Sequence, residues 1–221
     1  MARSRIASAR LYGFIDTAYL DGRDPAELAR AMIDGGVDVI QVRAKDLTHP
    51  VRVQLCAAVI GAAFRFGVPV IVNDDIAAAF ETGADGVHLG QEDWSTIPSD
   101  ERQARLAAIR IVGISTHSLD QALAAERDGA NYIGVGPVFA TATKPGVAPV
   151  GLDLVRQVSE RVAVPFFAIG GINMDNIGQV MEAGARRVAV VSALLKAEDP
   201  RGAARALKER LNEHTLSEDV G

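Results

Sequence analysis

Short apolar runs recur along the chain, and they set the first expectation for its fold. Eight runs are mostly apolar, and most of them do not alternate with polar positions. Continuous runs of this kind are typical of strands buried on both faces, as in a parallel sheet covered by helices. In chain order the runs are "YGFID", "DVIQVR", "PVIVND", "GVHLG", "IVGIS", "YIGVG", "PFFAIG" and "VAVVS".

Alanine-rich stretches with helical spacing lie between these runs, for example "PAELARAMID" and "LDQALAAERD". Three candidate N-caps mark where helices are expected to begin. They are Asp24, which precedes Pro25, together with Ser118 and Asn173. Strand and helix are therefore predicted to alternate throughout the chain.

An internal repeat supports this alternation. Four segments share a glycine, then a small or apolar residue, then one of the runs, and the glycines are Gly36, Gly83, Gly129 and Gly184. A glycine at this place is typical of a helix C′ position in the left-handed conformation. The glycines precede the second, fourth, sixth and eighth predicted strands.

Eight parallel strands in a two-unit repeat predict an α/β fold with one (β/α)8 TIM barrel over residues 1–221. Residues 1–9 and 213–221 are expected to be flexible tails. A doubly wound open sheet is the alternative. It is disfavoured because the chain has neither a GxGxxG turn nor a GxxxxGK loop.

Composition narrows the possible partners. The chain is 48% hydrophobic and 23% charged, and its formal net charge is −5. This balance is typical of a soluble globular protein and argues against a nucleic-acid partner or an anionic membrane surface. Because Cys56 is the single cysteine, an intramolecular disulfide framework and a cysteine zinc cluster are excluded. We expect Cys56 to be a small core residue.

No stretch approaches 18 uninterrupted apolar residues, and the start "MARSRIASAR" has no apolar region after its basic residues. We therefore expect a cytoplasmic protein that works on small molecules. Whether it is a monomer or a homo-oligomer stays open.

In a TIM barrel the active site lies at the C-terminal ends of the strands, and cationic residues follow the second run. Arg43 and Lys45 alternate in "QVRAK", so in strand geometry both would share one face with Gln41. Such a pair suits phosphate oxygens. The alternative is a pair of solvated charges at a strand end.

Carboxylates follow the third and fourth runs. Asn73 and Asp74 end the third, and Asp93 follows the fourth in "HLGQED". Two carboxylates at one height on neighbouring strands could share Mg²⁺, which completes its octahedron with water and substrate phosphate. Alternatively, either aspartate caps a helix.

The later strand ends also carry polar groups. Gly170 and Gly171, with the end of the eighth run, suit a backbone phosphate site, or else form a tight turn. His117 in "GISTHS" is either an acid or base or a structural histidine. His88 is expected to point into the barrel, and His49 to lie in a loop. Trp94 would cover the site or the barrel rim.

Together these positions predict two phosphate sites, one with Mg²⁺ and cations and one built from backbone, without an obvious nucleophile between them. That arrangement favours ionisation of a diphosphate, in which catalysis is mostly electrostatic and positional.

The ordered motifs resemble one known family, the thiamine phosphate synthases, also called thiamine-phosphate pyrophosphorylases. The resemblance covers about Leu11 to Leu195 and is carried by "QVRAKD", "VND", "GVHLGQED", "VGISTHS", "YIGVGPVFATATKP", "AIGGI" and "VAVVSAL". The family consists of (β/α)8 barrels. They join a hydroxymethylpyrimidine diphosphate to a hydroxyethylthiazole phosphate with Mg²⁺, giving thiamine phosphate and pyrophosphate.

The resemblance implies a transferase of thiamine biosynthesis and assigns a role to each rim residue. Pyrimidine diphosphate would be held by Gln41, Val42, Arg43, Ala44, Lys45, Asn73, Ser115 and Lys144. Thiazole phosphate would be held by Thr141, Ala142, Thr143, Gly171, Val191 and Ser192. Mg²⁺ would bind Asp74 and Asp93. Catalysis would involve Arg43, Lys45, Lys144 and Ser115.

Two other functions stay open. A thiazole tautomerase-type paralogue would act on the thiazole phosphate alone, with His117 as its acid or base. A non-catalytic barrel would bind thiamine-related phosphates and regulate another process. Neither needs both the aspartate pair and the full set of cations.

Overall fold

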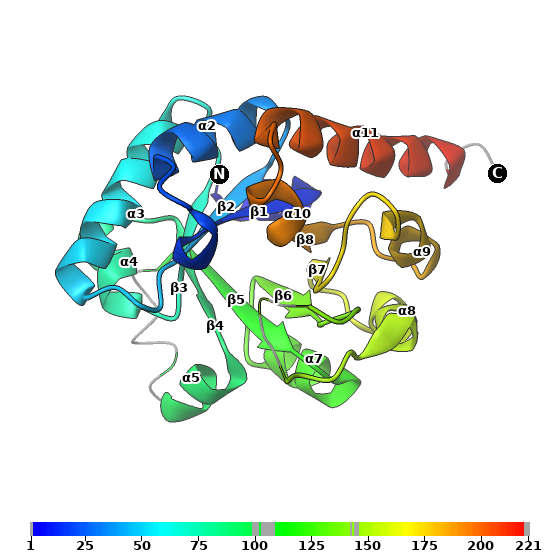
Figure 1. Cartoon of the computed structure of the whole chain (residues 1–221). Helices are drawn as coiled ribbons and strands as arrows, with labels where there is room; N and C mark the ends of the chain where they lie inside the picture. Colours follow the sequence, from blue (N-terminus) through cyan, green and yellow to red (C-terminus); the bar gives the residue numbers. More distant parts are fainter. Residues whose placement is uncertain (1, 99–101, 103–108, 142, 144–145, 219–221) are drawn as a thin grey trace.

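The computed structural model describes residues 2–98, 102, 109–141, 143 and 146–218 (Figure 1). Its strands are parallel and form one closed barrel in chain order, which confirms the predicted (β/α)8 fold and excludes the open sheet. The strands are β1 (Leu11–Asp16), β2 (Val39–Arg43), β3 (Val70–Asn73), β4 (Gly86–Leu89), β5 (Ile111–Thr116), β6 (Tyr132–Val135), β7 (Phe166–Ile169) and β8 (Val188–Val190).

Helices surround this barrel and cover its outer face (Figure 1). They are α1 (Ala2–Ser8), the short η1 (Thr17–Tyr19), α2 (Pro25–Asp34), α3 (His49–Phe64), α4 (Ile76–Thr82), α5 (Gln91–Thr96), α7 (Leu119–Arg127), α8 (Gly151–Arg161), α9 (Ile177–Glu182), α10 (Ser192–Leu195) and α11 (Pro200–Glu218). His49 therefore begins a helix, whereas a loop was expected.

The strands are buried on both faces, as their apolar composition predicted. Every residue of β1, β4, β6 and β8 is buried. Inside the barrel the rings of Tyr12 and Tyr132 each meet Phe167 edge-on, at centroid distances of 5.2 and 5.6 Å. Edge-on contacts of this kind add to the stabilisation from burial. Cys56 is fully buried, as expected, and burial raises the pKa of its thiol to about 11.

Two of the three predicted N-caps are confirmed. Asp24 accepts a hydrogen bond from the Glu27 amide at 2.8 Å, and Ser118 accepts one from the Gln121 amide at 3.2 Å. The third prediction is wrong. Asn173 accepts from the Asp175 amide at 2.8 Å, which closes a local turn, and α9 starts only at Ile177.

The four repeat glycines all adopt the predicted left-handed backbone. Their φ angles are +103° at Gly36, +65° at Gly83, +86° at Gly129 and +95° at Gly184. Glycine reaches this region without the steric cost of a Cβ atom. Each glycine thus allows a helix to end and the chain to turn directly into the next even-numbered strand.

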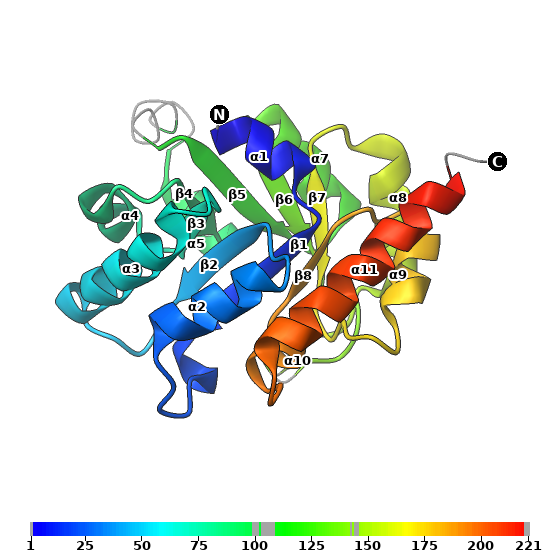
Figure 2. The same ribbon diagram turned by 90° about the horizontal axis from the view of Figure 1, so that it is seen from above.

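Residues 2–8 and 213–218 are helical, whereas residues 1–9 and 213–221 were expected to be flexible tails; Met1 and residues 219–221 lie outside the described residues. In α1, Ile6 is buried, and the Ala7 carbonyl accepts a hydrogen bond from Arg187 at 2.7 Å. Figure 2 shows α1 at the end of the barrel opposite α10. At the other end α11 continues to Glu218, and its Leu207 and Leu211 are buried. Apolar contacts therefore order α1 and the part of α11 that precedes residue 213.

No helix among the described residues is long and apolar enough to cross a bilayer. The cytoplasmic location stays a prediction.

The contact between β4 and β5 gives a stability prediction. A Cβ atom at Gly86 would overlap the Ile111 backbone oxygen, whereas a Cβ at Gly61 on α3 meets nothing within 4 Å. Gly86→Ala should lower the free energy of unfolding in urea by about 1–3 kcal/mol through overpacking. Gly61→Ala should raise it by about 0.5–1 kcal/mol, because alanine favours the helix. Equal effects of the two changes would contradict the packing described here.

Candidate active site

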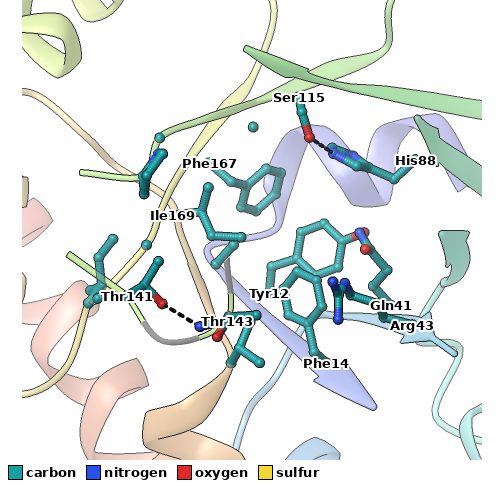
Figure 3. Close-up of a pocket in the computed structure, with 18 of the residues that line it drawn as sticks. Tyr12, Phe14, Gln41, Arg43, His88, Ser115, Thr141, Thr143, Phe167 and Ile169 are labelled. Carbon is teal, nitrogen blue, oxygen red and sulfur yellow. Dashed lines mark hydrogen bonds between the residues drawn. The ribbon is translucent and has the colours of Figure 1, made fainter. Parts of the chain in front are cut away.

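A cavity opens at the C-terminal ends of the strands, where a TIM barrel holds its active site (Figure 3). Nine of the residues predicted from the sequence line it together. They are Gln41, Arg43, Asn73, Ser115, Thr141, Thr143, Gly171, Val191 and Ser192. The closed barrel thus gathers side chains from β2, β3, β5 and the segments that follow β6, β7 and β8.

The other predicted residues lie elsewhere. Val42 is buried on the outer side of β2, so its side chain does not face the cavity. Ala44, Lys45 and Asp74 line an adjoining hollow, which shares Asn73 with the cavity. The remaining metal candidate, Asp93, lies in the first turn of α5. Ala142 and Lys144 lie outside the described residues.

Strand alternation explains only part of the cationic face. Gln41 and Arg43 both point into the cavity as predicted. The strand ends at Arg43, so the side chain of Lys45 need not point to the same face as those of Gln41 and Arg43. Its ammonium instead lies 3.5 Å from the Asp74 carboxylate, with 54% of the side chain exposed.

Arg43 is not a solvated charge, because a buried carboxylate holds it. Its Nη1 donates to Asp16 Oδ2 at 2.8 Å, and only 1% of the Asp16 side chain is exposed. Asp16 also accepts from the Ala18 amide at 3.1 Å. The sequence reasoning missed Asp16, which ends the run "YGFID". The signal was the strand register, since β1 pairs Asp16 directly with Arg43 on β2.

The two predicted metal ligands form an acidic pair. Burial, and then the negative charge of the Asp74 carboxylate, raise the pKa of Asp93, while Lys45 acts in the opposite direction. Asp74 has a left-handed φ of +61° and accepts from Asn73 Nδ2 at 2.6 Å and from the Gly90 amide at 3.2 Å. These contacts aim its carboxylate toward Asp93.

The alternative that Asp74 caps a helix is wrong. Asp75 caps α4 by accepting from the Ala78 amide at 2.8 Å, and its other oxygen pairs with Arg52 and His49. The described residues hold no group of three or more His, Cys, Asp or Glu suited to a metal. Two adjacent carboxylates still fit Mg²⁺, which keeps water and phosphate oxygens as its other ligands.

The backbone on the far side of the cavity is shaped by glycine. Gly170 and Gly171 have φ angles of +102° and +65°. A Cβ atom at Gly170 would overlap Pro137, and one at Gly171 would overlap the Ala140 oxygen. Close packing of two loops therefore explains both glycines. Gly171 also lines the cavity, and its carbonyl accepts a hydrogen bond from Asn176 Nδ2 at 2.9 Å.

Two threonines stand beside this backbone. The Thr143 amide donates to Thr141 Oγ1 at 3.2 Å, and the Thr143 hydroxyl lies 3.0 Å from that of Tyr19 on η1. Hydroxyl and amide groups of this kind are suited to phosphate oxygens, and α10 begins next to them at Ser192.

A chain of hydrogen bonds crosses the barrel through residues that line the cavity, and the sequence reasoning missed it. Ser115 Oγ lies 2.9 Å from His88 Nε2, and His88 Nδ1 lies 3.0 Å from the Tyr132 hydroxyl. That hydroxyl is 2.9 Å from the Tyr12 hydroxyl, to which Gln41 Nε2 donates at 2.9 Å. Figure 3 labels four of these residues: Tyr12, Gln41, His88 and Ser115. His88 points inward as predicted, and burial raises the pKa of both tyrosines.

His117 is held in place and also lines the cavity. Its amide donates to Gln121 at 2.7 Å, and its Nδ1 contacts the Gly136 carbonyl. A carbonyl only accepts, so Nδ1 carries the proton, and in the neutral ring Nε2 is an acceptor.

Trp94 is buried and does not line the cavity, so it does not cover the site. Its indole donates to Asp128 at 3.3 Å, and the Arg102 guanidinium lies 4.2 Å from the ring centroid.

Comparisons with known proteins identify the family of the chain. The family model described as thiamine monophosphate synthase matches residues 11–194. The chain belongs to this family. Within it, the chain is 42% identical to the thiamine-phosphate synthase of Chloroflexus aurantiacus over 209 residues, which is 94% of this chain and 95% of that protein. It is 48% identical to the thiamine-phosphate synthase of Thermus thermophilus over 178 residues, which is 80% and 84% of the two chains.

Solved structures give the same relation. The thiamine phosphate pyrophosphorylase of Pyrococcus furiosus is 32% identical and superposes with a TM-score of 0.84, covering 97% of this chain and 99% of that chain. A 3-hexulose-6-phosphate synthase is 27% identical, with a TM-score of 0.63. The thiamine monophosphate synthase fold is thus shared beyond the family, so the fold alone does not identify the site residues.

The pair of Arg43 and Asp16 yields a thermodynamic prediction for this family member. Removing one partner of a buried pair leaves the other charge uncompensated, so Asp16→Asn should lower the free energy of unfolding by about 3 kcal/mol. Combined with Arg43→Gln, it should show a coupling above about 1 kcal/mol in a double-mutant cycle.

The exposed pair of Asp153 and Arg156 on α8 is the matched control. Its cycle should show little coupling, because solvent screens surface pairs. Equal coupling energies for the two pairs would mean that Asp16 does not hold Arg43 electrostatically.

Proposed function

We propose that this chain joins a hydroxymethylpyrimidine diphosphate to a hydroxyethylthiazole phosphate, forming thiamine phosphate and releasing pyrophosphate. The relatives at 42% and 48% identity are thiamine-phosphate synthases. One observation of the site carries the proposal. An arginine and an acidic pair flank one side of the aromatic-walled cavity, and hydroxyls with the backbone of Gly171 flank the other.

The diphosphate is proposed to bind on the charged side. Arg43 is oriented by Asp16 and faces the cavity, and Lys45 reaches from the rim toward Asp74. Mg²⁺ would be held by Asp74 and Asp93, where its charge would offset that of the leaving pyrophosphate. The raised pKa of Asp93 supports this assignment, because two repelling carboxylates are relieved by a cation between them.

The two rings are proposed to lie between the charged side and the hydroxyls. Gln41, Asn73 and Ser115 would hydrogen-bond the pyrimidine. The thiazole phosphate would bind Thr141, Thr143, Gly171, Val191 and Ser192, all of which line the cavity. For Ala142 and Lys144 the family resemblance alone supports a role.

The proposed reaction needs positioning more than a strong base. The bond between the pyrimidine methylene carbon and the diphosphate oxygen breaks, and its electron pair leaves with pyrophosphate. The thiazole nitrogen then donates its lone pair to that carbon. Arg43 and Lys45 stabilise the negative charge that develops on the leaving pyrophosphate. The buried residues of the cavity wall exclude water from the positively charged pyrimidine that remains.

A thiazole tautomerase would use His117 as its acid or base, and His117 does line the cavity. Two other observations disfavour this function. It would leave unexplained the acidic pair and the buried carboxylate that orients Arg43. A non-catalytic barrel has the same difficulty.

The direct test supplies both phosphorylated substrates and Mg²⁺ to the purified protein. Pyrophosphate and thiamine phosphate should form in equal amounts. Isomerised thiazole phosphate without pyrophosphate would replace the synthase with the tautomerase. Thiamine-related phosphates that bind without any turnover would favour the non-catalytic barrel.

Lys45 should act mainly on the leaving group. Lys45→Ala should reduce kcat by about 100-fold, and more than it raises KM for the pyrimidine substrate, because the developing charge is greatest in the transition state. Steady-state kinetics would check this, with Arg156→Ala on the outer surface as the control. A change in KM alone would contradict the role.

The acidic pair makes the fold sensitive to pH and to Mg²⁺. The folded-state pKa of Asp93 lies above its ordinary value of 3.8. The folded chain therefore binds this proton more tightly, and stability falls as pH rises from 3.8 through the raised pKa. The Asp93→Asn variant should not lose stability in this way as pH rises. In chelator at neutral pH, the Tm of this variant should therefore equal or exceed the Tm of the natural chain.

Mg²⁺ should stabilise only the natural chain. It should raise the Tm of the natural chain and leave that of Asp93→Asn unchanged. An Asp93→Asn variant that Mg²⁺ still stabilises fully would place the metal elsewhere.

A further inference from the structure

The hydrogen-bond chain from Gln41 to Ser115 connects two separate strands of the cavity wall. Its ends line the cavity on β2 and β5. Its middle members are buried, with exposed fractions of 1% for Tyr12, 0% for Tyr132 and 9% for His88. Buried polar groups need partners, so every link of this chain must supply one donor and one acceptor.

The direction of one link sets the direction of all the others. Gln41 Nε2 can only donate, so the Tyr12 oxygen accepts there. The Tyr12 proton is then available for the Tyr132 oxygen, and the Tyr132 proton for His88 Nδ1. His88 consequently carries its own proton on Nε2 and donates to Ser115 Oγ. The Ser115 proton is left for the cavity.

Reversing only the middle of the chain is costly. If His88 Nδ1 donated to Tyr132, and Tyr132 to Tyr12, the Tyr12 oxygen would accept twice. Its own proton would then have no acceptor in any hydrogen bond given for the described residues. An unpaired buried hydroxyl proton costs about 1–3 kcal/mol, so the ordering that starts at Gln41 is favoured.

We propose that this proton ordering selects the pyrimidine. Because Gln41 Nε2 is held by Tyr12, Gln41 offers its Oε1 as an acceptor, and the ordering leaves the Ser115 hydroxyl as a donor toward the cavity. The matching ring carries an N–H group that faces Gln41 and an unprotonated ring nitrogen that faces Ser115, as an aminopyrimidine does. Tyr12, Tyr132 and His88 are positioning residues for this recognition. The assignment of the ring rests on the proposed function, whereas the ordering itself does not.

The first test reads the ordering without substrate. In protein labelled with ¹⁵N-histidine, NMR should show His88 with a protonated Nε2 and an unprotonated Nδ1. The His88→Gln variant assigns the signals, because only those of His88 disappear. A His88 ring protonated at Nδ1 alone, or at both nitrogens near neutral pH, would overturn the proposal whether or not the protein is a synthase.

The second test reads the selection. Binding of 4-amino-2-methyl-5-hydroxymethylpyrimidine is compared with that of its 4-oxo analogue, which exchanges the amino donor for an acceptor. The natural chain should prefer the amine by about tenfold or more, and Tyr132→Phe should lose most of that preference because His88 is no longer held in one tautomer. A Tyr132→Phe protein that keeps the full preference would overturn the proposal.

His49→Gln is the control, since this imidazole lies on α3 outside the cavity, and it should keep the preference. If Tyr132→Phe does not fold, Tyr12→Phe cuts the same chain one link away and should give the same loss. If neither pyrimidine binds the natural chain, the proposed function fails, and the NMR measurement alone decides the ordering.

Discussion

The closure of eight parallel strands into one ring is the constraint on which the site depends. All strands point the same way, so residues far apart in the sequence end at one rim. The register pairs Asp16 with Arg43 and Asn73 with His88. Neither pair is adjacent in the sequence, yet each supplies a neighbouring part of the cavity. The chemistry of the site is therefore a consequence of strand order and register.

Charge is distributed unevenly around that rim. Arg43 is compensated by a buried carboxylate, whereas Asp74 and Asp93 repel each other and depend on Lys45 for relief. Arg43 is thus fixed before any ligand arrives, whereas the acidic pair would gain stability from a cation. In the proposed reaction the diphosphate would supply the anion for Arg43, and Mg²⁺ would supply the cation for the acidic pair.

Much of this arrangement could be predicted from the sequence. The apolar runs and the repeat glycines depend on local periodicity and backbone conformation, and the structure confirms them. It also places nine of the predicted strand-end residues in one cavity. Non-local contacts were harder to predict. Asp16 was assigned only to a strand, because its role depends on Arg43, its partner on the neighbouring strand β2. The hydrogen-bond chain from Gln41 to Ser115 joins five strands, and no spacing in the sequence predicts it. The helical ends likewise depend on contacts of Ile6 and Leu211 with distant parts of the core.

The most direct measurement of the central claim is a crystal structure with Mn²⁺ in place of Mg²⁺, pyrophosphate and thiamine phosphate, with the metal located by anomalous scattering. The account predicts the metal on Asp74 and Asp93 and the pyrophosphate oxygens against Arg43 and Lys45. It also predicts the phosphate of thiamine phosphate beside Thr141 and Gly171. Metal bound away from both aspartates, or pyrophosphate bound on the threonine side, would contradict the account.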